Sequence, residues 1–101
     1  GQRGLQRDLF KGRLMKGNSM QVAIIGTGHV GLVTGAGLAD LGHRVICADI
    51  DKEKVKWLQE GISPIYEPGL SELVGRNITK ERLAFTTSVV EAVQASEVIL
   101  A

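Results

Sequence analysis

Short apolar runs alternate with longer amphipathic segments along most of this chain. Residues 21–25, 44–49, 83–86 and 97–101 are rich in apolar side chains and too short to form buried helices. Runs of this length, bounded by glycine and polar residues, are typical of strands buried in a parallel sheet. The sequence therefore predicts four strands.

The segments between these runs show helical spacing or helix-capping residues. A helix is predicted over 29–41, with Val30, Thr34, Gly37, Leu38 and Leu41 on its inner face. Asp51 can cap a second helix over 52–60, and Ser88 with Glu91 forms a capping box that opens a third, over 88–95. Between them we expect a proline-containing loop at 63–70, a short helix at 71–74 and a polar loop at 77–82.

This order of elements predicts the fold class. Strands that alternate with helices form a parallel sheet with right-handed crossovers, which gives a Rossmann-type, doubly wound α/β fold. In such a sheet the fourth strand lies beside the first. Because a strand is an unusual place for a domain to stop, we expect the fold to be truncated after its fourth strand.

Composition restricts the possible classes of protein without changing this prediction. The chain has 101 residues, of which 44% are hydrophobic and 23% charged, values typical of a globular domain rather than a membrane-spanning one. Residues 1–19 hold five basic residues and one acidic residue, so we interpret them as a tag or an upstream extension without ordered structure. Residues 20–101 hold seven basic and ten acidic residues and carry no basic patch for nucleic acid.

One motif carries candidate chemistry. It follows the first strand, opens the first helix and has the pattern G-x-G-x-x-G: Gly26, Thr27, Gly28, His29, Val30 and Gly31. In this context the first glycine permits a sharp turn, the second lets a pyrophosphate approach the backbone, and the third lets the helix pack closely on the strand. The helix then presents free N–H groups and its positive dipole end to the phosphates.

An acidic residue completes the dinucleotide-binding pattern. Asp49 ends the second strand, 18 residues beyond Gly31, close to the spacing of about 20 that the pattern requires. Its carboxylate can accept hydrogen bonds from the adenosine ribose and would repel a 2′-phosphate, so NAD is favoured over NADP. Two alternatives stay open: a tight turn with no ligand, or another nucleotide cofactor such as FAD or S-adenosylmethionine.

The remaining candidates are weaker. Cys47 lies in the middle of a predicted strand, where a thiol is normally inert packing. His29 and Lys54 are each as compatible with an exposed surface position as with cofactor contact, whereas Gly35 and Gly37 are interpreted as sites of close helix–sheet packing. The sequence offers no catalytic constellation and no metal-ligand cluster.

Several segments resemble the UDP-glucose/GDP-mannose dehydrogenase family. The similarity extends from Met20 to Ala101, and its most specific part is Pro-Ile-Tyr-Glu-Pro-Gly-Leu, in the tyrosine form of the UDP-glucose branch. The other matching stretches are 22–35, 49–51, 82–87 and 95–99. The chain departs from the family at His29, where a tyrosine is usual.

The resemblance implies an enzyme that oxidises the C6 hydroxyl of a nucleotide sugar to a carboxylate with two NAD. It implies that the 26–31 loop, Asp49 and Lys54 hold the cofactor, and that the catalytic cysteine belongs to a later domain, so this segment alone would be inactive. It further implies a cytoplasmic homodimer that makes precursors for polysaccharides, with no membrane or nucleic-acid partner. A dehydrogenase of GDP-mannose or of a UDP-amino sugar, and a non-catalytic NAD-binding module, are the alternatives.

Overall fold

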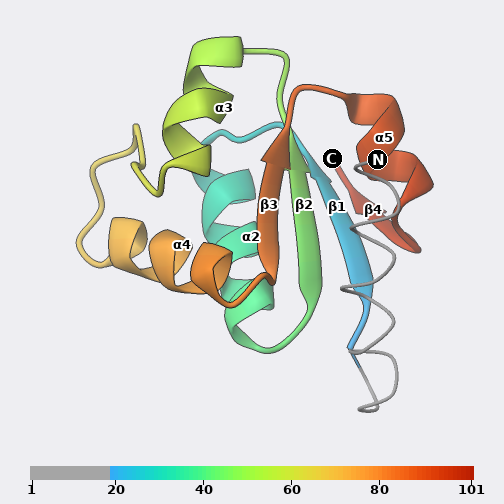
Figure 1. Ribbon diagram of the computed structural model, residues 1–101, viewed down its shortest axis with the longest axis horizontal. Coiled ribbons are helices and arrows are strands. Elements are labelled where there is room, and N and C mark those ends of the chain that lie inside the picture. Colours follow the sequence, from blue (N-terminus) through green and yellow to red (C-terminus); the bar gives the residue numbers. More distant parts are fainter. Residues whose placement is uncertain (1–18) are drawn as a thin grey trace.

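The computed structural model describes residues 19–101, which form one sheet with helices on both faces (Figure 1). The prediction made for residues 1–19 lies, except for Ser19, outside this described part. Four parallel strands follow the order β3-β2-β1-β4. The elements are β1 (Gln21–Ile25), α2 (His29–Asp40), β2 (Arg44–Ala48), α3 (Lys52–Gln59), α4 (Leu70–Thr79), β3 (Leu83–Thr86), α5 (Val89–Gln94) and β4 (Val98–Leu100).

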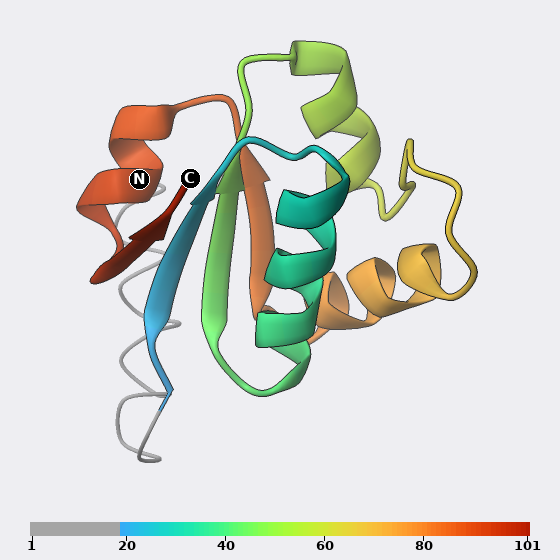
Figure 2. The ribbon, with the colours of Figure 1, turned by 180° about the vertical axis from the view of Figure 1, so that it is seen from behind.

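The strand order confirms the doubly wound fold. After β1 the chain builds outward through β2 to β3, then returns across the sheet so that β4 pairs with the other side of β1. Helices α2, α3 and α4 cover one face and α5 covers the opposite face (Figures 1 and 2). The chain therefore reverses its winding between β1 and β4, the point at which α/β sheets of this kind bind ligands.

Alternation along the strands divides the core between the two faces of the sheet. On β1, Val22 and Ile24 pack into the large cluster under α2, α3 and α4, whereas Ala23 joins a smaller cluster with Ile46 and Ala92 of α5. Every residue of β2 is buried, as expected for a strand with neighbours on both sides and helices on both faces.

The predicted inner face of α2 is largely wrong, although Leu38 does pack against the core as expected. Val30 and Leu41 are each 78% exposed, and the buried residues of the helix are Leu32, Gly35, Ala36 and Ala39. Small side chains occupy this face because the helix lies very close to the sheet: a Cβ on Gly35 would lie 2.9 Å from Sγ of Cys47. Close helix–sheet packing was also predicted at Gly37, but there a Cβ would meet nothing within 4 Å, so this prediction is wrong.

Helix α4 is longer than the sequence pattern predicts. It runs to Thr79, through part of the segment expected to be a polar loop. Gly75 and Asn77 have low helix propensity, but the Asn77 side chain is fully buried and bonded within a tertiary network. Local propensity is therefore overridden by packing at this position.

Candidate functional site

The glycine loop joins the end of β1 to the start of α2. Gly26 has a φ of 95°, a left-handed conformation in which its N–H donates to the carbonyl of Ala48 at 2.7 Å. A side chain would be strained at that φ. The loop thus turns sharply off the sheet and remains bonded to the end of β2.

The other two glycines of the motif differ in what surrounds them. A Cβ on Gly31 would lie 2.5 Å from the carbonyl oxygen of Gly26, a contact that the rigid backbone cannot relieve. A Cβ on Gly28 would meet nothing within 4 Å. Gly31 is therefore required by the fold, whereas the open space at Gly28 is what a ligand approaching the backbone needs.

The first turn of α2 is suited to an anion. Gly28 is the N-cap, no side chain of the described residues caps it, and the first turn contains no acidic residue. A hollow of about 450 Å³ opens beside it, lined by the loop, the ends of β1 and β4, and Thr34. Unpaired N–H groups and the positive end of the helix dipole therefore border an open cavity.

Asp49, immediately after β2, is bonded directly to the glycine loop. Its Oδ2 accepts from the Thr27 hydroxyl at 2.5 Å and from the Thr27 N–H at 2.9 Å. The Nζ of Lys54 lies 3.5 Å from the same oxygen. The other oxygen, Oδ1, accepts from the N–H of Asp51 at 3.0 Å.

These contacts keep the Asp49 carboxylate ionised. Desolvation opposes ionisation, but the Thr27 hydroxyl, the N–H groups of Asp51 and Thr27, and the charge of Lys54 outweigh it and lower the pKa to about 2. The side chain is only 13% exposed. A fixed negative charge therefore lies beside the loop, where a ribose hydroxyl can be bound and a phosphate repelled.

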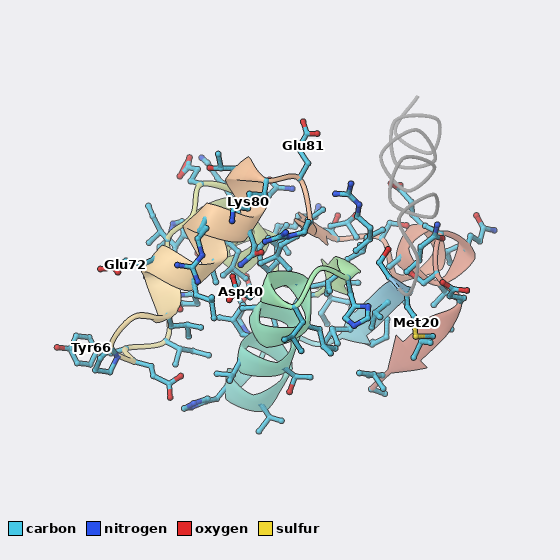
Figure 3. All side chains as sticks on the ribbon, turned by 90° about the horizontal axis from the view of Figure 1, so that it is seen from below. Met20, Asp40, Tyr66, Glu72, Lys80 and Glu81 are labelled. Carbon is cyan, nitrogen blue, oxygen red and sulfur yellow. The ribbon has the colours of Figure 1, made fainter. Side chains whose placement is uncertain are left out.

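The site residues predicted from the sequence do not all face the same way. Thr27 is fully buried and points to Asp49, whereas Val30 is 78% exposed. His29 borders the cavity, and its Nε2 lies 3.3 Å from Oε2 of Glu67 in the proline-containing loop. Tyr66, the neighbour of Glu67, is 99% exposed and points away from the body of the molecule (Figure 3).

Sequence reasoning missed two of these contacts. The Thr27–Asp49 bond could have been anticipated, because a short polar side chain between two glycines lies beside the end of the next strand in this fold. The His29–Glu67 pair could not, since nothing in the spacing of two residues 38 positions apart indicates that the loops meet.

Neither catalytic nor metal-binding chemistry is evident in the described part of the chain. Within residues 19–101 no group of three or more His, Cys, Asp or Glu side chains could hold a metal ion. Burial raises the pKa of the Cys47 thiol to about 12, which suits packing rather than nucleophilic attack. None of the helices described is long and apolar enough to span a bilayer.

Comparison with known sequences identifies the same region in characterised proteins. The UDP-glucose/GDP-mannose dehydrogenase family, NAD binding domain, matches residues 20–101. UDP-glucose 6-dehydrogenase TuaD of Bacillus subtilis is 48% identical over 79 residues, which are 78% of this chain and 17% of that protein. GDP-mannose 6-dehydrogenase of Azotobacter vinelandii is 44% identical over 78 residues, which are 77% of this chain and 18% of that protein.

Solved structures give the same result. The UDP-glucose dehydrogenase of the archaeon Pyrobaculum islandicum superposes with a TM-score of 0.78 and 40% identity, over 81% of this chain and 19% of its own. A ternary complex of a GDP-mannose dehydrogenase from Pseudomonas aeruginosa gives a TM-score of 0.77 and 39% identity, over 79% of this chain and 18% of its own. The chain thus spans less than a fifth of the length of each of these relatives.

Proposed function

The chain belongs to the UDP-glucose/GDP-mannose dehydrogenase family, as its NAD-binding domain, and we propose that the protein carrying it oxidises UDP-glucose to UDP-glucuronate. The reaction uses two NAD, because an alcohol must lose four electrons to become a carboxylate. The observation that carries the cofactor part of this proposal is the Asp49 carboxylate, bonded to the glycine loop beside an uncapped helix.

The residues present fit NAD. The open space at Gly28 lets a pyrophosphate approach the backbone, and the N–H groups of the first turn of α2 supply the donors. Asp49 accepts from the adenosine ribose, with Lys54 close by and with His29 and Val30 at the rim of the cavity. NAD, when bound, supplies the hydride acceptor for the oxidation.

Asp49 also sets the preference between the two nicotinamide cofactors. A carboxylate with a pKa of about 2 is fully charged at neutral pH, and a 2′-phosphate in its place of contact would meet a like charge in a poorly solvated site. We therefore expect NADP to be rejected.

The rest of the catalytic machinery belongs, in this proposal, to other parts of the protein. A catalytic thiol and a nucleotide-sugar pocket would come from beyond these residues, so the segment alone would be inactive. The complete protein would act as a cytoplasmic homodimer that supplies a precursor for polysaccharides.

The preference for UDP-glucose is supported by the relatives. Three bacterial UDP-glucose 6-dehydrogenases are each 48% identical to the chain, against 44% for the GDP-mannose enzyme of Azotobacter vinelandii. This difference is small, and the TM-scores to a UDP-glucose dehydrogenase and a GDP-mannose dehydrogenase are nearly equal, at 0.78 and 0.77. GDP-mannose oxidation is therefore the second candidate.

The test is NADH formation by the product of the full reading frame, offered UDP-glucose and GDP-mannose separately. We expect about two NADH for each UDP-glucose, and no NADPH when NADP replaces NAD. NADH formation with GDP-mannose but not with UDP-glucose would identify GDP-mannose as the substrate instead. NAD binding without oxidation of any nucleotide sugar would leave a cofactor-binding module and overturn the enzyme proposal.

A further inference from the structure

Thr27 occupies the variable position between the first two glycines of the loop, yet its side chain does not face the cavity. It is fully buried, and both its hydroxyl and its N–H donate to the same oxygen of Asp49, at 2.5 and 2.9 Å. A single residue thereby fixes the carboxylate that follows β2 to the loop that follows β1.

We propose that Thr27 is a positioning residue, which binds one oxygen of Asp49 so that the other is presented to the adenine ribose of the cofactor. Its hydroxyl acts on affinity through Asp49 and never touches the ligand. This inference rests on the proposed cofactor site.

Counting acceptor positions supports this assignment. A carboxylate offers about four lone-pair positions. On Oδ2 both are taken by Thr27, with Lys54 as a further charge at 3.5 Å. On Oδ1 the N–H of Asp51 takes one, which leaves one position for a ribose hydroxyl. Oδ1 is thus the oxygen available to a ligand, and Thr27 determines which oxygen that is.

The electrostatics agree with the geometry. Among the interactions that lower the pKa of Asp49, the hydrogen bond from the Thr27 side chain is the largest. The hydroxyl therefore both orients the carboxylate and favours its charged form. Without the hydroxyl, Oδ2 would face a methyl group and would keep only the Thr27 N–H and the charge of Lys54, so the carboxylate would be held less firmly toward the ribose.

The decisive variant is Thr27→Val, which keeps the shape of the side chain and removes only the hydroxyl. Its matched control is Thr27→Ser, which keeps the hydroxyl and removes a methyl group. Binding is measured by calorimetry on the full-length protein, with ADP as the probe for the adenosine half of NAD. The second probe is 2′,3′-dideoxy-ADP, which retains the diphosphate but has no ribose hydroxyl.

For Thr27→Val we expect ADP to bind about tenfold more weakly, because a hydrogen bond to a charged group is lost, while dideoxy-ADP binding stays unchanged. Thr27→Ser should bind both probes nearly as the parent does. An equal loss for the two probes in Thr27→Val would mean that Thr27 only supports the fold, and would overturn the proposal. If thermal unfolding shows that Thr27→Val does not fold, Thr27→Ala replaces it with the same expectation.

Asp49→Asn separates failure of this inference from failure of the cofactor site. If Asp49→Asn weakens ADP but not dideoxy-ADP, and Thr27→Val weakens neither, the site stands and the role of Thr27 is wrong. If the Asn variant binds ADP as the parent does, Asp49 does not hold the ribose, and the site and the inference fall together.

Discussion

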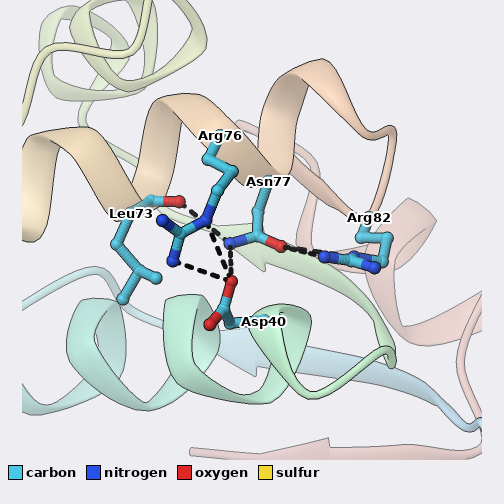
Figure 4. Close-up of polar contacts among 5 residues, drawn as sticks. All are labelled: Asp40, Leu73, Arg76, Asn77 and Arg82. Atoms are coloured by element: carbon cyan, nitrogen blue, oxygen red, sulfur yellow. Dashed lines mark hydrogen bonds and ion pairs between the residues drawn. The ribbon is translucent and has the colours of Figure 1, made fainter.

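Two aspartates at opposite ends of the sheet each accept hydrogen bonds from a neighbouring element, but the Asp49 side chain is 13% exposed and that of Asp40 is 38% exposed. Asp49 lies just after β2, where it is bonded to Thr27 of the glycine loop, and Asp40 ends α2 at the opposite end of the sheet. Oδ1 of Asp40 accepts from Arg76 at 3.0 Å and from Asn77 at 3.1 Å (Figure 4). Both carboxyls have a lowered pKa: that of Asp40 through Asn77 and Arg76, that of Asp49 mainly through Thr27.

The difference lies in where the donors originate. Asp40 is bound by side chains of α4, and the network continues from Asn77 to Leu73 and Arg82, so this end is joined by side chains. At the other end of the sheet the glycine loop contributes backbone N–H groups, and the side chains beside it are those of Thr27, Lys54 and the His29–Glu67 pair. The end of the sheet whose backbone N–H donors are uncovered can bind a ligand. The end where side-chain hydrogen bonds join α2 to α4 contributes to stability instead.

The largest effect on stability and on NAD binding is expected at Gly31. Gly31→Ala places a Cβ 2.5 Å from the carbonyl of Gly26, so the loop and α2 must move apart. We expect a loss of about 3 kcal/mol in unfolding free energy, together with loss of NAD binding. Urea unfolding and calorimetry measure the two effects.

The control for that change lies in the same helix. Gly37→Ala adds the same methyl group where nothing lies within 4 Å, and should stabilise the helix by roughly 0.5–1 kcal/mol with NAD affinity unchanged. Equal destabilisation by the two substitutions would show that the helix, rather than the loop contact, controls the effect.

At the opposite end, Asn77→Ala should reduce stability without reducing cofactor affinity. The amide is fully buried and bonded to Asp40, Leu73 and Arg82, so truncation leaves several polar groups unpaired, at a cost of about 2–3 kcal/mol. Arg76→Ala, on a side chain that is 51% exposed, should cost less than about 1 kcal/mol. A fall in NAD affinity for Asn77→Ala, measured on folded protein, would contradict the division between the two ends.

Lowering the pH is expected to have a smaller effect, on the unfolding free energy. The folded-state pKa of Asp49, about 2, lies below its unfolded value, so its contribution is complete above about pH 5 and is lost as the pH falls toward 2. The contribution amounts to about 2 kcal/mol. Asp49→Asn should therefore flatten the fall in unfolding free energy between these pH values. Asp40→Asn changes it in the same direction. If neither variant changes the acid profile, the hydrogen bonds to these carboxylates contribute nothing to stability.

The sequence predicted the strands, the winding of the sheet and the glycine loop, because each depends on short patterns with a strong local cause. It failed where tertiary contacts decide. Close packing at Gly35 was predicted correctly. Val30 and Leu41 were wrongly assigned to the inner face of α2, since small residues such as Ala36 and Ala39 carry little hydrophobic signal yet are what close packing requires. Helix α4 was predicted too short because Asn77 is typical of a loop until its partners on other elements are known.

Pairing of β1 with β4 has a consequence for the order of folding. The side chain of Glu97 accepts from the N–H of Gln21 across 76 residues, so the first of these strands to be synthesised gains its second neighbour last. On the ribosome, β1, β2 and β3 with their helices can assemble while one edge of β1 is still open. Closing that edge is a long-range step. The unit formed by β1, β2 and β3 with their helices would therefore be in place before β4 pairs with it. Nascent chains would be most prone to aggregation before β4 emerges, while one edge of β1 is unpaired.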